Sequence, residues 1–418
     1  MSSSAALLAQ VIIAGGGPAG STLAYRLAAA GMSVAVFEKA TFPRYKTCGG
    51  GIQAKTAEIL DFSIEPVVER ILTKIQVTLH MGRPLVRLDD PPVYAVMRDR
   101  FDSFLADKAK EKGAHFFEDE RVTDVQEGPD DVLVRTTRRL ARASVVVGAE
   151  GAASVVRGTL YPRLELEADI GLEAEITVPV ECLDELGETI LLDWGTLPGG
   201  YAWVFPKGGH LSIGVGGPSQ IRGRLRGHFR HFLAKLEEQG VIRDFSVDRV
   251  SAHRLPMVIG ENRFNTPRTL LVGDSAGLID PFTGEGLYYA VKSGQMAAAV
   301  ISRSVLEEAP MLDPYTKEIA AAIASEIEYA RSLMHLFNTW PGGFHAWLRR
   351  SDRLASAMAR TLTGDKSYAS WRHDLGMASF LWPLIDAASG RITRRKLARM
   401  AARKRPGDVL IDTGTPPF

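Results

Sequence analysis

Short apolar runs that end in glycine-rich loops mark the start of the chain. Residues 10–14 form an apolar run that predicts a buried parallel strand. Residues 21–30 have helical composition and end at Gly31, a residue typical of helix C-termini. Residues 34–37 form a second apolar run, which ends at Glu38. This strand–helix–strand order predicts one βαβ unit of an α/β fold.

Two later runs repeat the strand pattern, and helices follow. Residues 143–147 and 270–272 are apolar, strand-like and lead into glycine-containing loops. Residues 287–304 have helical composition. From residue 311 onward the chain is typical of helices with several breaks, such as the one at residues 341–343. We therefore predict an α/β protein with a helical C-terminal region.

The composition is that of an ordinary globular protein and disfavours several functional classes. Hydrophobic residues make up 45% of the 418 residues, and the net charge is +1, so we expect no nucleic-acid partner. The two cysteines, Cys48 and Cys182, are too few for a disulfide framework or a cysteine-rich metal site, and we expect no metal. The sequence also lacks a signal-peptide pattern and a window of about 18 uncharged apolar residues. These features predict a cytoplasmic protein without a membrane span.

The loop after the first predicted strand carries a dinucleotide-binding motif, Gly15-Gly16-Gly17-Pro18-Ala19-Gly20. Gly15 permits the tight turn, Gly17 lets the backbone approach a pyrophosphate, and Gly20 allows close helix–strand packing. The next helix offers free N–H groups at its N-terminus, and Glu38 lies where a carboxylate accepts hydrogen bonds from ribose hydroxyls. The alternative is a tight turn that binds nothing. Because strand, helix, second strand and acid are all in place, we predict a Rossmann-type dinucleotide site.

Two later loops and one arginine distinguish FAD from NAD. The loops are Gly148-Ala149-Glu150-Gly151 and the long segment 273–286, which begins Gly273-Asp274 and contains Gly284 and Gly286. With Arg98 they resemble the FAD-dependent oxidoreductases of the p-hydroxybenzoate hydroxylase fold. The resemblance implies that Asp274 binds the ribityl chain and that Arg98 lies near the pyrophosphate; for Arg98 the alternative is a surface helix arginine.

The same resemblance implies a complete FAD site. The helix after Gly286 would point its N-terminus at the flavin and stabilise an anionic reduced flavin. Where the family motif usually has Asp-Gly, this chain has Glu150-Gly151, which keeps the charge on a longer side chain. No second GxGxxG unit follows, so NAD(P)H or another reductant would be a transient electron donor. The residues assigned to FAD are Gly15, Gly17, Pro18, Ala19, Gly20, Glu38, Lys39, Arg44, Cys48, Gly49, Gly50, Arg98, Val122, Glu150, Gly151, Gly273, Asp274, Pro281, Gly284, Gly286 and Leu287.

An aromatic hairpin is predicted in the middle of the chain. Residues 201–207 and 210–216 are two strand-like runs joined by Gly208-Gly209, and this pair readily takes positive φ. Because strand residues alternate between faces, Tyr201, Trp203 and Phe205 share one face. By themselves they fit a sheet core better than a pocket wall. Gly214 and Gly216 fit either close packing or room for a ligand.

Cys48 also has two interpretations. A cysteine is often a small buried hydrophobe, which is the interpretation that we favour for Cys182. Cys48, however, is followed by three glycines and preceded by Arg44 and Lys46. Glycine-rich backbone allows close approach to a flavin ring, and nearby cations can lower the pKa of a thiol.

Segments 44–51 and 198–207 together look like those of the geranylgeranyl reductase family, which saturates isoprenoid double bonds. The segment 362–368 is similar to bacterial members. The resemblance implies a reductase in which FAD delivers hydride to a C=C bond of a polyprenyl chain, with a prenylated lipid or prenyl diphosphate as substrate. It places Cys48 beside the flavin, where Cys48 or a nearby water supplies the proton. The implied catalytic residues are Cys48, Tyr201 and Trp203, and the implied substrate-binding residues are Tyr201, Trp203, Phe205, Gly214 and Gly216.

These assignments predict three units. The FAD-binding domain is discontinuous and comprises residues 8–62, 98–160 and 262–310. A mostly β substrate domain takes residues 63–97 and 161–261. The C-terminal helical region spans residues 311–418.

The C-terminal region contains a basic segment beside an apolar one. Residues 377–384 are apolar and include Phe380 and Trp382, and residues 391–405 are rich in arginine and lysine without an acidic residue. Such a pair can dock on anionic lipid at the inner face of the membrane. A solvated final helix is the alternative.

Two other functions remain open. A flavin monooxygenase or halogenase on the same fold would use oxygen, although the 44–51 and 201–207 segments argue against it. A non-catalytic flavin- and lipid-binding protein would show no turnover with any reductant. Fold analogy alone does not assign a substrate.

Overall fold

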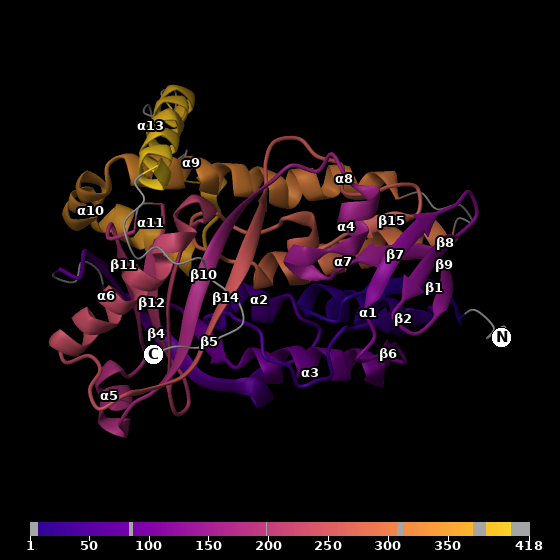
Figure 1. The fold of residues 1–418 in the computed structure, drawn as a ribbon, viewed down its shortest axis with the longest axis horizontal. Coiled ribbons are helices and arrows are strands. Elements are labelled where there is room, and N and C mark those ends of the chain that lie inside the picture. Colours follow the sequence, from indigo (N-terminus) through magenta and orange to yellow (C-terminus); the bar gives the residue numbers. More distant parts are fainter. Residues whose placement is uncertain (1–6, 83–86, 198, 307–311, 371–381, 403–418) are drawn as a thin grey trace.

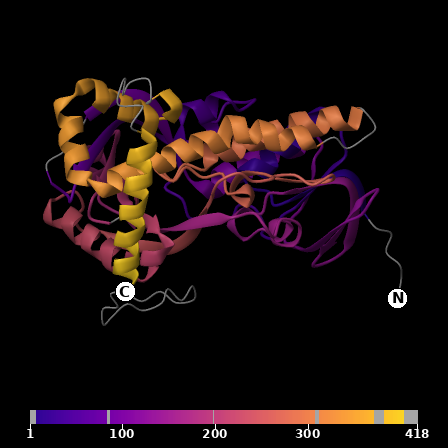
Figure 2. The ribbon, with the colours of Figure 1, turned by 90° about the horizontal axis from the view of Figure 1, so that it is seen from above.

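The computed structural model describes residues 7–82, 87–197, 199–306, 312–370 and 382–402. It contains two β-sheets at opposite ends of an elongated molecule, with long helices running between them (Figures 1 and 2). Pro198, residues 377–381 and residues 403–405, which belong to three of the sequence motifs, lie outside the described residues.

The first sheet is the nucleotide-binding sheet. Its strand order is β6-β2-β1-β9-β8-β7, and β15 pairs with β9. The pairs among β6, β2, β1, β9 and β15 are parallel, whereas β7 and β8 are antiparallel additions. The strands are β1 (Leu7–Ala14), β2 (Val34–Phe37), β6 (His115–Phe117), β7 (Val122–Glu127), β8 (Val132–Thr136), β9 (Leu140–Gly148) and β15 (Thr269–Leu271).

Helices cover this sheet and bury its apolar runs. The central strand β1 is fully buried from Val11 to Ala14, as expected for a parallel strand covered on both faces. Its core includes residues of the first helix and of the long helix that follows the segment 273–286. The helices around this sheet are α1 (Pro18–Ala29), α3 (Arg98–Glu111), α4 (Val155–Leu160) and α7 (Leu287–Leu306), with short 3₁₀ turns η2 (Gly151–Ala153) and η4 (Gly273–Ala276).

The second sheet has eight strands in the order β14-β10-β13-β12-β11-β4-β5-β3. One face packs its alternate apolar residues on helix α6, and the other face borders a cavity. The strands are β3 (Gly51–Gln53), β4 (Val68–Leu79), β5 (Arg87–Val96), β10 (Leu166–Thr177), β11 (Thr189–Trp194), β12 (Tyr201–Pro206), β13 (Leu211–Pro218) and β14 (Ser246–Val258). The helical elements in these segments are α2 (Ala54–Glu58), η1 (Glu65–Val67), α5 (Val180–Leu186), η3 (Ser219–Arg224) and α6 (Leu225–Glu238).

The described C-terminal region is helical, as predicted. Helix α8 (Asp313–Ile319), a π-helical turn η5 (Ala320–Ala324) and α9 (Ser325–Thr339) follow one another without a break and run along the length of the molecule (Figure 2). The break predicted at residues 341–343 lies one residue earlier, at Trp340, because residues 341–343 form the first turn of α10 (Pro341–Arg350), where proline is tolerated. Helices α11 (Asp352–Leu362) and α13 (Trp382–Ala402) complete the region.

Two local expectations need adjustment. The predicted hairpin is present, and Lys207 N–H donates to His210 O at 2.9 Å to close it. Gly208 and Gly209, however, are not among the glycines with positive φ. Strand β3 pairs with β5 in the second sheet, although its residues fall within the range that we assigned to the FAD-binding domain. The division into three units therefore remains a prediction, with β3 bridging two of them.

Candidate functional site

A cavity of about 1110 Å³ lies between the two sheets. Its walls come from the glycine-rich loop before α1, the segment 44–51, the segment 279–287 and the cavity face of the second sheet. Segments that are far apart in the sequence therefore meet at one site, which is large enough for a dinucleotide together with a second molecule.

The GxGxxG loop has the geometry that its spacing predicts. Gly15 has φ +98°, and a Cβ there would lie 2.4 Å from Ala149 O. A Cβ on Gly20 would lie 2.0 Å from Gly15 O, so this glycine allows the helix to touch the loop. A Cβ on Gly17 would meet only Arg44, at 3.6 Å, so this glycine leaves the cavity open at the N-terminus of α1. The loop can therefore cradle a pyrophosphate.

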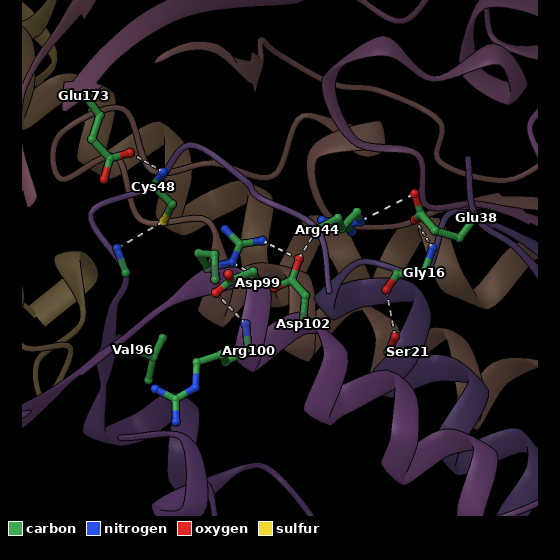
Figure 3. A network of polar contacts seen from close by, with 12 residues as sticks. Gly16, Ser21, Glu38, Arg44, Cys48, Val96, Asp99, Arg100, Asp102 and Glu173 are labelled. Carbon is green, nitrogen blue, oxygen red and sulfur yellow. Dashed lines mark hydrogen bonds and ion pairs between the residues drawn. The ribbon is translucent and has the colours of Figure 1, made fainter. Parts of the chain in front are cut away.

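Glu38 closes the loop from the end of β2. Its carboxylate accepts the N–H of Gly16 at 2.9 Å (Figure 3). It also accepts the N–H of Ala40, at 3.1 Å. It also forms an ion pair with Arg44 Nε at 3.4 Å, and this nitrogen has no hydrogen-bond partner among the described residues. Arg44 therefore keeps a donor that a phosphate oxygen can use.

Arg98 is buried in the cavity wall, so the surface interpretation of this residue is wrong. Its guanidinium binds Asp102 through two hydrogen bonds of 2.8 and 3.0 Å, one helical turn away. Arg44 donates to the same carboxylate at 3.0 Å (Figure 3). Asp102 is fully buried, and the bidentate geometry is typical of strong, oriented ion pairs. One aspartate therefore orients two cations at this end of the cavity.

Asp274 and Lys46 both line the cationic part of the cavity, and their charges attract each other. Burial raises the pKa of Asp274, while the charges of Lys46 and Arg98 oppose the rise. Burial, followed by the charge of Arg98, lowers the pKa of Lys46 to about 8. His253 on β14 lies nearby, and burial together with the charge of Lys46 lowers its pKa to about 3. An anionic ligand would relieve the repulsion among these groups.

The carboxylate of Glu150 has a structural partner. It accepts the N–H groups of Val155 and Val156 at 2.9 and 3.1 Å and the hydroxyl of Ser154 at 2.6 Å. The longer side chain thus caps the N-terminus of α4. Glu150 still lines the cavity, but its charge is already engaged by this helix.

Cys48 lies in the cavity wall, on the glycine-rich segment. Its Sγ accepts the N–H of Gly50 at 3.4 Å, and its own N–H donates to Glu173 Oε2 at 2.5 Å (Figure 3). A Cβ on Gly50 would lie 2.2 Å from Val96 O and 2.3 Å from Lys207 Nζ, so no other residue fits there without movement. Cys182 is fully buried in the core beside α6, as favoured from sequence.

The aromatic side chains of β12 line the cavity rather than a closed core. Trp203 lies flat on β13, since a Cβ on Gly214 would come within 2.1 Å of its indole. The Tyr201 hydroxyl donates to Thr283 O on the loop before α7, and the Tyr201 and Trp203 rings lie 5.8 Å apart. Phe205 packs under the glycine-rich segment. Gly214 therefore makes room for Trp203, and does not itself line the cavity.

One flank of the cavity is apolar. Trp194 packs on Phe337 of α9 with ring centroids 4.7 Å apart, and Phe282 lies against the same ring at 6.0 Å. Sequence reasoning missed this flank because its residues come from five separate helices and strands and from the loop before α7. The apolar side chains of this flank are Ile75, Val93, Ile190, Leu192, Trp194, Phe282, Met334, Phe337 and Leu362.

The cavity also contains acids that sequence reasoning missed. Asp169 lies on the cavity face of β10, and no hydrogen bond or ion pair holds its carboxyl within the described chain. Burial, together with the charge of Glu167, raises its pKa to about 7. Asp280 is also buried, but it accepts hydrogen bonds from Phe282 N–H and from the Tyr368 hydroxyl. Asp169 is thus the unengaged carboxyl of the pair.

The cavity brings together most of the residues that the sequence singled out. Those that line it include Gly15, Gly17, Pro18, Ala19, Glu38, Lys39, Arg44, Cys48, Gly49, Gly50, Arg98, Val122, Glu150, Gly151, Asp274, Pro281, Gly284, Gly286, Leu287, Tyr201, Trp203, Phe205 and Gly216. Gly20, Gly273 and Gly214 lie behind the wall, where each allows a close packing contact.

Comparisons with known proteins identify the class of this site. The family described as FAD binding domain matches residues 8–185. Digeranylgeranylglycerophospholipid reductase 1 of Methanopyrus kandleri is 30% identical over 324 residues, which cover 71% of this chain and 81% of the relative. Geranylgeranyl diphosphate reductase of Synechocystis is 29% identical over 318 residues, covering 71% and 75%.

Solved structures show the same fold. A geranylgeranyl bacteriochlorophyll reductase-like protein from Thermoplasma acidophilum has a TM-score of 0.71 at 20% identity and covers 94% of this chain and 99% of its own. A flavin-dependent brominase has a TM-score of 0.72 at 18% identity, covering 93% and 100%.

The fold and the motifs together define an FAD-dependent oxidoreductase. Within that class, the chain belongs to the geranylgeranyl reductase family. The residues present fit FAD: the open glycine cradle, the free donor of Arg44 and the carboxylates of Glu38 and Asp274 all border one cavity. Among the described helices, none is both long and apolar enough to cross a membrane.

Removing the Asp274 carboxylate tests the FAD site. We expect Asp274→Ala to raise the dissociation constant of FAD by about tenfold or more, because a hydrogen bond to a charged group contributes ~1.5–3 kcal/mol. Titration of flavin-free protein with FAD, followed by flavin fluorescence, measures this change. Asp313→Ala is the control, because its side chain is 80% exposed. Equal affinity of the two variants for FAD would remove Asp274 from the site.

Proposed function

We propose that this protein is an FAD-dependent reductase that saturates C=C bonds of a polyprenyl chain of the geranylgeranyl type. The observation that carries the proposal is the division of the cavity. Its FAD motifs lie beside a flank of apolar and aromatic side chains, which suits a long hydrocarbon chain better than a polar substrate. Relatives named as geranylgeranyl reductases support the same substrate class.

The chemistry of an isolated alkene explains the need for this lining. Reduced FAD, once bound, supplies a hydride, and the other carbon of the double bond must receive a proton. Protonation gives tertiary carbocation character, which aromatic faces stabilise by cation–π attraction. Tyr201 and Trp203 line the cavity beside the glycine-rich segment. An apolar wall also excludes water, which would trap the cation.

Turnover of a prenyl substrate under anaerobic conditions is the direct test. The enzyme is photoreduced and mixed with geranylgeranyl diphosphate or a geranylgeranylated glycerophospholipid in detergent micelles. We expect flavin reoxidation together with a product that has gained two hydrogen atoms per bond reduced. NAD(P)H and other reductants are then compared as electron donors. In a parallel aerobic assay, oxygen consumption coupled to a hydroxylated or halogenated product would instead favour the monooxygenase or halogenase alternative. No turnover with any reductant in either assay would favour a binding protein.

Two groups compete as the proton source. Cys48 lies beside the predicted flavin position, but its Sγ accepts a hydrogen bond from Gly50 and its surroundings are cationic. Asp169 is unengaged, lines the cavity and has a pKa of about 7, which suits a general acid at neutral pH. We propose that Asp169 or Cys48 donates the proton, either directly or through one water.

Conservative variants separate these two proton donors. If Asp169 is the acid, Asp169→Asn lowers kcat by about 100-fold or more, the usual contribution of general-acid catalysis. Cys48→Ser then changes kcat less. Single-turnover oxidation of the reduced flavin by the prenyl substrate, measured across pH, gives both values. The wild-type rate should fall as pH rises through about 7, since Asp169 loses its proton there. A full loss in Cys48→Ser with an active Asp169→Asn would assign the role to Cys48.

We further propose contact with an anionic membrane surface around α10. Trp340 and Trp347 are 69% and 41% exposed, and Arg349 and Arg350 are exposed beside them. The rings of Trp347 and Phe344 have centroids 6.1 Å apart, and those of Phe344 and Phe337 have centroids 5.4 Å apart. An aromatic series therefore connects this face to the apolar flank of the cavity.

Helix α13 adds basic residues at the same end of the molecule (Figures 1 and 2). Five basic residues of this segment are exposed on a helix, which also fits the alternative of a solvated helix. Exposed tryptophans beside arginines favour the membrane, because both residue types stabilise interfacial contacts. The exposed basic residues of α13 are Arg391, Arg394, Arg395, Lys396 and Arg399.

Vesicle co-sedimentation tests the membrane face. Replacing Arg349 and Arg350 together by Gln should weaken binding to phosphatidylglycerol-containing vesicles by roughly 30-fold, at ~1 kcal/mol per arginine. Turnover of detergent-solubilised substrate should not change. The matched control replaces Arg135 and Arg138 by Gln, since these arginines are exposed on the first sheet. Equal vesicle binding by both double variants would exclude this face as the docking surface.

A further inference from the structure

Two buried charged residues hold the glycine-rich segment from below. Lys207 directly follows β12 and is 1% exposed. Its Nζ donates to Gly49 O at 2.6 Å and to Val96 O at 2.7 Å. Glu173 on β10 is fully buried, and it accepts the Cys48 N–H at 2.5 Å. The backbone of residues 48–49 is thus bound at two points: the Gly49 carbonyl accepts from Lys207, and the Cys48 N–H donates to Glu173.

The strength of each contact depends on whether Lys207 and Glu173 are charged. The ammonium of Lys207 binds carbonyl oxygens, while its full burial disfavours the charged form and lowers its pKa. Glu173 also accepts the Ser212 hydroxyl at 2.6 Å. An ionised carboxylate binds an N–H roughly twice as strongly as a neutral acceptor does. The hold on Cys48 therefore depends on whether Glu173 carries a proton.

We propose that Glu173 and Lys207 are positioning residues for the flavin-facing segment 48–50, and that protonation of Glu173 loosens this segment. The proposal rests on the FAD site and not on the identity of the substrate. Loss of prenyl reduction would leave it standing, and its own failure would leave the reductase proposal standing.

The surroundings of Glu173 set the pH at which this change occurs. Burial, followed by the charge of Glu175, raises the pKa of Glu173 to about 7, whereas the Ser212 hydroxyl and the charge of Lys207 oppose the rise. Tyr45 also lies close, and His210 pairs with Glu175 at 2.8 Å. Below about pH 7 the protonated form of Glu173 prevails. Above about pH 7 the carboxylate prevails, and it binds the Cys48 N–H more strongly.

Amide hydrogen exchange of the FAD-bound enzyme measures the hold on the segment directly. After correction for the chemical exchange rate, protection of the peptide that spans residues 44–54 should increase by about fivefold as pH rises through about 7. Glu173→Gln should remove this step and leave low protection at every pH. Lys207→Met should lower protection at every pH. Glu167→Gln, the same change at an exposed position of β10, is the control and should keep the step.

Two further variants leave Glu173 in place and predict opposite shifts. Glu175→Gln removes a negative charge that raises the pKa of Glu173, so the step should move to lower pH. Ser212→Ala removes a hydrogen bond that stabilises the carboxylate, so the step should move to higher pH. These shifts test the proposal even if Glu173→Gln does not fold. A wild-type enzyme without a step, or a step that neither variant moves, would overturn it.

Discussion

The indole of Trp203 rests on backbone, and the cavity depends on that contact. The strands beneath the ring carry glycine at Gly171, Gly214 and Gly216, so one large side chain covers three positions. The ring in turn supports the glycine-rich segment, because a Cβ on Gly49 would lie 3.3 Å from the indole nitrogen. A side chain at Gly214 would displace the ring, and with it the glycine-rich segment that packs on the ring. The position of the ring is therefore set by the absence of side chains at Gly171 of β10 and at Gly214 and Gly216 of β13.

The two ends of the cavity differ in polarity: one is cationic and the other is apolar. Arg44, Lys46 and Arg98 gather near the N-terminus of α1, where a pyrophosphate would neutralise them. The opposite flank is lined by aliphatic and aromatic side chains from β4, β5, β11, α9, α11 and the loop before α7. A molecule with a charged group and a hydrocarbon chain would be oriented by this difference alone. If FAD binds as proposed, its pyrophosphate would engage these cations, and the apolar end would remain for the substrate.

Sequence could predict the parts of the site that depend on local spacing. Gly15, Gly17 and Gly20 lie where the motif requires, and the alternation of Tyr201, Trp203 and Phe205 places all three on the cavity face. Groups that act across long sequence separations could not be predicted. Glu173 reaches Cys48 over 125 positions, and neither residue carries a signal of the contact. The capping role of Glu150 could not be predicted either, because a sequence motif shows the charge but not which backbone N–H groups donate to it.

The continuous helix from Asp313 to Thr339 belongs to both ends of the molecule. Its first half joins the core of the nucleotide-binding sheet, where the Tyr315 hydroxyl donates to Leu271 O, and its last turns carry Phe337 into the apolar flank. An α-helix rises 1.5 Å per residue, and the π-helical turn η5 interrupts that repeat without ending the helix. The length of this helix therefore fixes the distance between Phe337 in the apolar flank and the nucleotide-binding sheet. For a substrate built of repeating isoprene units, that distance would decide which double bond lies next to the flavin.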